Sequence, residues 1–152
     1  MRTAAIAALS GLLALPVCEA KQHSTFRVHM EASANNGPAF STQLQLFGRP
    51  VTIEKVPTIS ERDVAGLQVY RAADGSYGAL LELNAHGRLA LDSLSIERRG
   101  SFLFVFVNGR PITQLQIDRR VSDGKIYIAS GLTTNEIESM KKDWPPSAPR
   151  KK

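Results

Sequence analysis

Apolar and polar residues alternate along several short segments of this 152-residue chain. An alternation with a period of two predicts strands with one buried face. In the clearest case, FRVHMEA at residues 26–32, the apolar side chains point one way while Arg27, His29 and Glu31 point toward solvent. We predict strands over residues 26–32, 44–47, 51–56, 67–71, 77–83, 102–107, 112–117 and 125–129.

Residues 102–107 (FLFVFV) break this alternation, because every position is apolar. A strand of that kind needs cover on both faces. We therefore expect a central strand, either covered on both sides within this chain or covered once and paired with a neighbouring chain. Asn108 and Gly109 follow directly, and this pair favours a tight hairpin turn.

Two segments have the signals of a helix start. Asn84 is a good N-cap, and residues 85–98 are the predicted main helix. Thr133 lies three residues before Glu136, the spacing of a capping box, and opens a second helix that reaches Trp144. In the main helix, the residues expected to face the sheet are Leu89, Ala90, Leu94 and Ile96. The pattern predicts an α+β fold, with a single, mostly antiparallel sheet and two helices packed on one face.

The first twenty residues have the pattern of a secretory signal peptide, with one early charge, a short apolar run and a small residue at Ala20. We expect residues 1–20 to be removed and residues 21–144 to form one exported domain, periplasmic or extracellular. No later segment is long and apolar enough to cross a bilayer. Cys18 leaves a lipidated, envelope-anchored form open, although the bulky Val17 before it is atypical of lipoprotein signals.

Most of the net charge of +5 lies at the C-terminus. The last twelve residues hold five basic side chains and one acid, which leaves about +1 for the rest of the chain. A nucleic-acid-binding domain needs its basic surface on the folded part, so we expect no nucleic-acid partner. Residues 145–152 are rich in proline and lysine, and we expect a disordered basic tail capable of weak contact with an anionic membrane surface.

Catalytic and metal-binding patterns are missing from the sequence. Its three histidines, His23, His29 and His86, lie in no nucleophile motif or metal-ligand spacing. We expect no cofactor, no metal and no enzymatic activity. The alternative is a small extracytoplasmic hydrolase with Asp118 or Asp123 as base, which requires one of these acids to meet a histidine in a pocket.

Residues 59–140 show an ordered series of turns, caps and core positions. The series comprises Leu81-Glu82-Leu83, Arg99-Gly100, Asn108-Gly109-Arg110-Pro111, Asp123-Gly124, Gly131-Leu132-Thr133 and Glu136. In this order they resemble the periplasmic head of SecD, a subunit of bacterial protein export. The resemblance implies a ferredoxin-like head and, since the head of SecD contacts unfolded exported chains, contact with a peptide or protein. The chain departs from the SecD pattern in having no transmembrane helices, and in Asn108 where Asp is usual.

We accordingly expect a non-enzymatic interaction domain that binds an extracytoplasmic protein or peptide, by edge-strand pairing or on an exposed sheet face. An arginine held on a rigid turn, as at Arg110, can grip a carboxylate. A lipid-anchored structural protein of the envelope is the second alternative. The candidate partner-binding residues are Arg27, His29, Glu31, Asn108, Gly109, Arg110 and Pro111.

Overall fold

The computed structural model describes residues 23–147. The predicted signal peptide (residues 1–20) and Cys18 lie outside this range, as do residues 148–152 of the expected tail. Within the described range, no helix is long and apolar enough to span a membrane.

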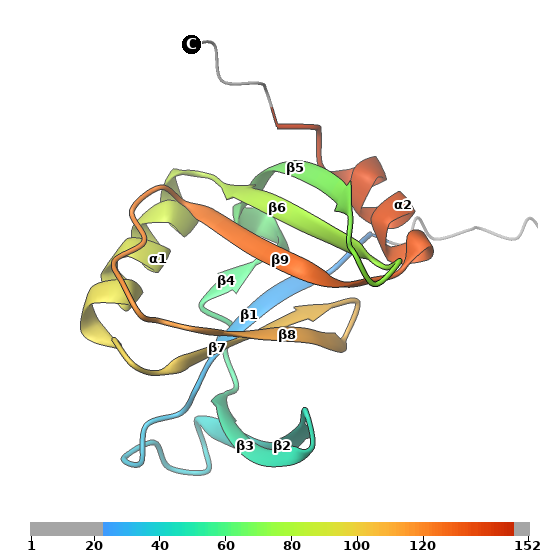
Figure 1. The fold of residues 1–152 in the computed structure, drawn as a ribbon. Helices are drawn as coiled ribbons and strands as arrows, with labels where there is room; N and C mark the ends of the chain where they lie inside the picture. The colour runs from blue at the N-terminus through green and yellow to red at the C-terminus, as the bar shows by residue number, and fades with distance from the viewer. Residues whose placement is uncertain (1–22, 148–152) are drawn as a thin grey trace, which may run out of the picture.

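The described residues form nine strands, two α-helices and one 3-10 turn, in an α+β arrangement (Figure 1). The predicted elements are present, with shifts of a few residues at their ends. The elements are β1 (Phe26–Met30), β2 (Ser41–Leu46), β3 (Arg49–Glu54), β4 (Ile59–Ser60), a 3-10 turn (Glu61–Asp63), β5 (Val64–Arg71), β6 (Tyr77–Leu83), α1 (Ala85–Glu97), β7 (Phe102–Val107), β8 (Arg110–Gln116), β9 (Lys125–Leu132) and α2 (Thr134–Asp143).

The expected single sheet is wrong, because the strands form three antiparallel sheets. Their orders are β4-β1-β7-β8, β5-β6-β9 and the hairpin β2-β3. The four-stranded and three-stranded sheets bury their apolar faces in one shared core, and α1 and α2 lie toward opposite ends of the molecule in Figure 1. Two sheets that each have an apolar face bury more of it by packing face to face than one continuous sheet would.

Strand β7 lies between β1 and β8, and its two faces belong to different cores. Leu103, Val105 and Val107 are buried in the main core. On the opposite face Phe104 is fully buried under the β2-β3 hairpin, in a second cluster with Leu46, Val51 and Ile53. The predicted double cover of this strand is confirmed, and both covering layers come from the same chain.

The predicted apolar face of α1 is correct for Leu94, which packs against the main core, and wrong for Leu89 and Ile96. Leu89 and Ile96 are 67% and 57% exposed, whereas the buried positions are Gly87, Leu91 and Ser95. The small residues explain this orientation. A Cβ at Gly87 would lie 2.8 Å from the Asp63 side chain, so only glycine allows the helix to approach so closely. The Ser95 hydroxyl, for its part, accepts a 2.9 Å bond from a loop amide.

The chain continues beyond α2 as an ordered segment. Leu67 of β5 donates to the Pro145 carbonyl (3.0 Å), and the Ser147 amide donates to the Leu67 carbonyl (3.1 Å), which makes a short parallel bridge. Gly66 allows this approach, since a Cβ there would lie 2.8 Å from the Ser147 hydroxyl. Residues 145–147, expected in the disordered tail, are therefore hydrogen-bonded to β5.

Candidate functional site

The turn between β7 and β8 has the left-handed backbone that the Asn-Gly pair predicts, with φ of 50° at Asn108 and 77° at Gly109. The Asn108 side chain accepts a 2.9 Å bond from the Thr25 amide, and the Asn108 amide donates to the Thr25 carbonyl at 2.9 Å. Both bonds tie the turn to the residue that precedes β1. Pro111 follows in β8, opposite Phe106.

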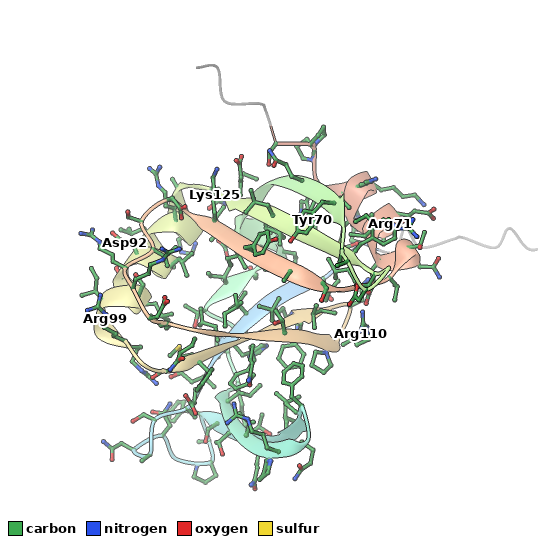
Figure 2. The ribbon with its side chains drawn as sticks, viewed as in Figure 1. Tyr70, Arg71, Asp92, Arg99, Arg110 and Lys125 are labelled. Carbon is green, nitrogen blue, oxygen red and sulfur yellow. The ribbon has the colours of Figure 1, made fainter. Side chains whose placement is uncertain are left out.

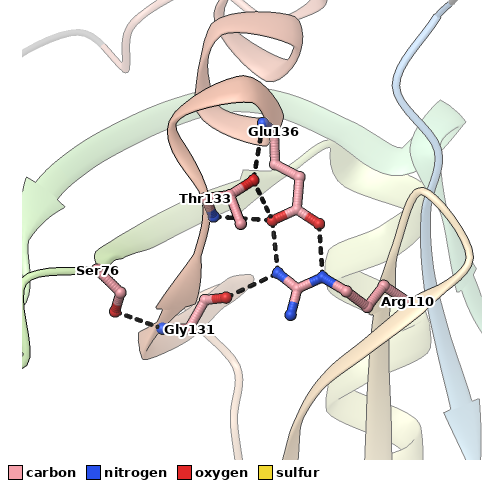
Figure 3. Close-up of polar contacts among 5 residues, drawn as sticks. All are labelled: Ser76, Arg110, Gly131, Thr133 and Glu136. Carbon is pink, nitrogen blue, oxygen red and sulfur yellow. Dashed lines mark hydrogen bonds and ion pairs between the residues drawn. The ribbon is translucent and has the colours of Figure 1, made fainter.

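Arg110 forms an ion pair with the carboxylate of Glu136 in the same chain, as Figure 3 shows. Its Nε donates to Glu136 Oε1 at 2.9 Å and its Nη2 to Glu136 Oε2 at 2.6 Å, a two-pronged pairing. A third bond runs to the Gly131 carbonyl at 2.7 Å. The same Glu136 accepts the amide of Thr133 (2.8 Å) and completes the predicted capping box of α2.

The electrostatics of this cluster follow from those contacts. Burial alone raises the pKa of the Glu136 carboxyl, but the bonds from Arg110 and Thr133 outweigh it, so the pKa is held below its usual value. The same pairing raises the pKa of Arg110. We refer to Asn108, Arg110, Thr133 and Glu136 as the turn cluster; its polar groups hold β8, β9 and α2 together.

The outward face of β1 is only partly open. Arg27 is exposed, with its Nε 3.9 Å from Glu61. His29 is half-buried; its Nδ1–H donates to the Glu54 carbonyl at 2.8 Å, and its ring lies edge-on to Phe106. Glu31 accepts the Phe102 amide at 3.0 Å.

Within residues 23–147, neither Asp118 nor Asp123 bonds to a histidine, as the hydrolase alternative requires. Asp118 and Asp123 are exposed, and Asp123 accepts the Lys125 amide in a local turn. His86 pairs instead with Asp63 at 2.7 Å. Across residues 23–147, no group of three or more histidine, cysteine or acidic side chains is placed to hold a metal ion.

A groove that the sequence did not indicate lies between β5 and the end of α2. It has a volume of about 620 Å³. Trp144 packs edge-on against Phe26 in the core, with ring centroids 6.4 Å apart, and also reaches the groove. The groove is lined by Leu67, Gln68, Val69, Lys141, Trp144 and Pro146. We refer to it as the β5 groove; Trp144, an aromatic residue at a helix end, is the one sequence feature that could have indicated it.

Strand β5 is an edge strand, because β6 pairs with it on one side only. On its other side the only bridge within the described residues is the one at Leu67. Backbone groups in an antiparallel pair alternate between the two sides, so Val69 and Arg71 direct their N–H and C=O groups the same way as Leu67. They are a ready template for an added strand.

The outer face of this sheet beside the groove is aromatic. Tyr70 stacks on Tyr127, with centroids 5.4 Å apart and an interplanar angle of 11°. Its hydroxyl donates to the Ile128 carbonyl, and its ring lies over Gly78, where a Cβ would clash with it. Figure 2 shows Tyr70 on the open face of the sheet, with Arg71 toward the α2 end of the view.

Comparisons with known proteins establish the fold. No protein-family model and no curated protein matches the chain. A solved structure of SecDF, a membrane component that enhances protein export, is similar with a TM-score of 0.56 and 15% identity over 82% of this chain. A second SecDF structure, in a super-membrane-facing form, aligns at a TM-score of 0.48 and 11% identity over 80% of this chain. The chain spans 64% and 28% of those two chains. The predicted resemblance to a SecD-like domain is confirmed as a likeness of fold.

Proposed function

We propose that this chain is an exported, non-enzymatic domain that binds extended segments of polypeptide during protein export. The observation that carries the proposal is the open edge of β5 beside an apolar groove. Unpaired strand edges bind extended chains through main-chain hydrogen bonds, and adjacent pockets take alternate side chains. The SecDF-like fold supports the same role, since the SecDF protein enhances protein export.

The location outside the cytoplasm rests on the predicted signal peptide, residues 1–20. Intact mass of the exported protein tests it. A measured mass equal to that of residues 21–152 supports a released domain. A mass equal to that of residues 18–152 with a diacylglycerol adduct on Cys18 supports an envelope anchor. A full-length mass that still includes Met1 would contradict export by this route.

The binding experiment uses a reporter within the chain. Trp144 is the single tryptophan in the sequence and lines the β5 groove. Titration of the exported protein with a tryptophan-free polypeptide, kept unfolded by removal of its disulfides, is expected to shift the Trp144 emission in a saturable way. The same polypeptide in its folded, oxidised form is the control and is expected to leave the emission unchanged.

Two results contradict the proposal. One is an emission that stays constant up to saturating unfolded polypeptide. The other is an equal response to the folded control, because a folded protein has few extended segments to offer. Hydrolysis of the unfolded polypeptide during the titration would instead favour the enzyme alternative.

A further inference from the structure

The edge of β5 beside the groove has two backbone positions without a partner among residues 23–147 and one that is already paired. Pro145–Ser147 occupies the position at Leu67, as the first short piece of an added strand. Val69 and Arg71 are next along the same edge, and no hydrogen bond from residues 23–147 reaches them from that side. A ligand strand has room to pair with these two residues.

The sequence after Ser147 is poorly suited to continue the parallel pairing along β5. If the parallel register continued past Ser147, the next donor to the Val69 carbonyl would come from Pro149, which has no N–H. The tail after it is Arg150-Lys151-Lys152. A second copy of the chain would have to bring a complementary strand of its own.

The charge of the groove indicates the chemistry of the ligand. Its lining contains one cation, Lys141, and no acid. Among residues 23–147, no ion pair involves Lys141. Arg71, at the second open backbone position, has its guanidinium 5.5 Å from the Tyr77 ring centroid and no acidic partner within the same residues. Both cations are exposed.

The apolar part of the groove lining indicates that the ligand also has an apolar side chain. Leu67, Val69 and Trp144 provide an apolar wall. Side chains of a strand alternate between two faces, so a ligand that pairs with Val69 presents every second side chain to this wall. An apolar side chain gains from burial there.

We propose that the β5 groove binds an extended peptide by strand addition at Val69 and Arg71, and that it prefers a segment with an apolar side chain flanked by acidic ones. This inference rests on the proposed function and assigns it a place and a ligand class. The apolar side chain lies against Trp144, and a neighbouring carboxylate pairs with Lys141.

The first test compares two charge reversals on one helix. Lys141 and Lys142 are adjacent, exposed and in the last turn of α2, but only Lys141 lines the groove. The probe is a tryptophan-free peptide of alternating valine and glutamate, followed by Trp144 emission. Lys141→Glu is expected to weaken its binding about five- to tenfold, because one attraction becomes a repulsion. Lys142→Glu is expected to change the affinity less than about twofold.

The second test probes the backbone without changing the protein. Only alternate amides of an added strand donate to its partner. Two versions of the peptide, N-methylated at odd or at even positions, are expected to differ in affinity. One should bind about fivefold or more weakly than the unmethylated peptide, and the other nearly as well as it.

A third test reverses the charge of the peptide. A peptide with lysine in place of glutamate is expected to bind weakly to the parent protein and better to Lys141→Glu.

The outcomes separate the two proposals. Suppose that unfolded polypeptide shifts the Trp144 emission, but Lys141→Glu and Lys142→Glu bind the acidic peptide with equal affinity. The proposed ligand preference is then wrong, and the proposed general function stands. Equal tolerance of both methylation patterns contradicts strand addition. Peptide-independent dimers, seen by analytical ultracentrifugation, would assign the edge to a second copy. If neither the unfolded polypeptide nor the acidic peptide shifts the Trp144 emission, both proposals are wrong.

Discussion

The turn cluster and the β5 groove differ in whether their polar groups are free to bind a partner. In the sequence, Arg110 on its hairpin turn is the feature that most resembles a recognition site. In the structure its guanidinium is paired with Glu136, and Asn108 is bonded to Thr25. The groove has no polar motif, yet it combines an unpaired strand edge with an apolar wall.

The difference arises from whether the polar groups of each region are already hydrogen-bonded within the protein. Arg110 and Glu136 satisfy one another and the start of α2, and such a cluster stabilises the fold. Beside the groove, the backbone N–H and C=O groups of Val69 and Arg71 have no partner on their outer side among residues 23–147, and the Lys141 ammonium makes no ion pair there. If this contrast is right, substitutions in the turn cluster change stability, and substitutions in the groove change binding.

The largest expected effect on stability comes from Glu136→Gln. The change weakens the pairing with Arg110 and the contact to the Thr133 amide in a largely buried place, and we expect a loss of about 2–3 kcal/mol in the free energy of unfolding. Urea unfolding measures it. Glu138→Gln is the control, because Glu138 is on the same helix but exposed, and should change stability by less than about 0.5 kcal/mol. Equal effects in the two variants would contradict a stabilising role for Glu136.

A smaller effect is expected at the turn itself. Asn108→Ala forces an alanine into φ of 50° and removes the bond from the Thr25 amide, for a loss of about 1–2 kcal/mol. Asn108→Gly keeps the backbone conformation and loses only the side-chain bond, so it should cost less than the alanine variant. Thermal unfolding of both variants decides this. Weaker binding of unfolded polypeptide by folded Asn108→Gly would instead make the turn a contact site.

The pH dependence of stability should follow the same cluster. The pKa of the Glu136 carboxyl is lower in the folded protein than its ordinary 4.5, so its contribution is complete above that value. The contribution is lost as the pH falls below 4.5 toward the folded pKa. We expect Glu136→Gln to lose stability less steeply than the parent protein in this range, in urea unfolding at stepped pH. Parallel curves would contradict the role of this carboxylate.

The smallest effect on stability is expected in the groove. Lys141 is exposed and its side chain makes no ion pair within residues 23–147, so Lys141→Ala should change the free energy of unfolding by less than about 0.5 kcal/mol. Its affinity for the acidic peptide should nevertheless fall about two- to fivefold. Loss of stability without loss of binding would reverse the assignment of the two regions.

Local patterns predicted the elements well. The alternation in residues 26–32 placed Phe26, Val28 and Met30 in the core, and these three are fully buried. The Thr133–Glu136 spacing forms the expected capping box. The uniform apolarity of residues 102–107 predicted cover on both faces of β7. These features depend on neighbours in the chain, and for that reason they can be read from it.

The arrangement of the elements depended on contacts between distant residues. The division into three sheets, the rotation of α1 onto Gly87, Leu91 and Ser95, and the pairing of Arg110 with Glu136 each join segments far apart in the chain. Strands, caps and turns could be predicted from the amino-acid sequence, because hydrogen bonding and burial patterns within an element are local. Which strand edge stays open depends on the packing of all the elements, because an edge strand is one that has no neighbouring strand on one side.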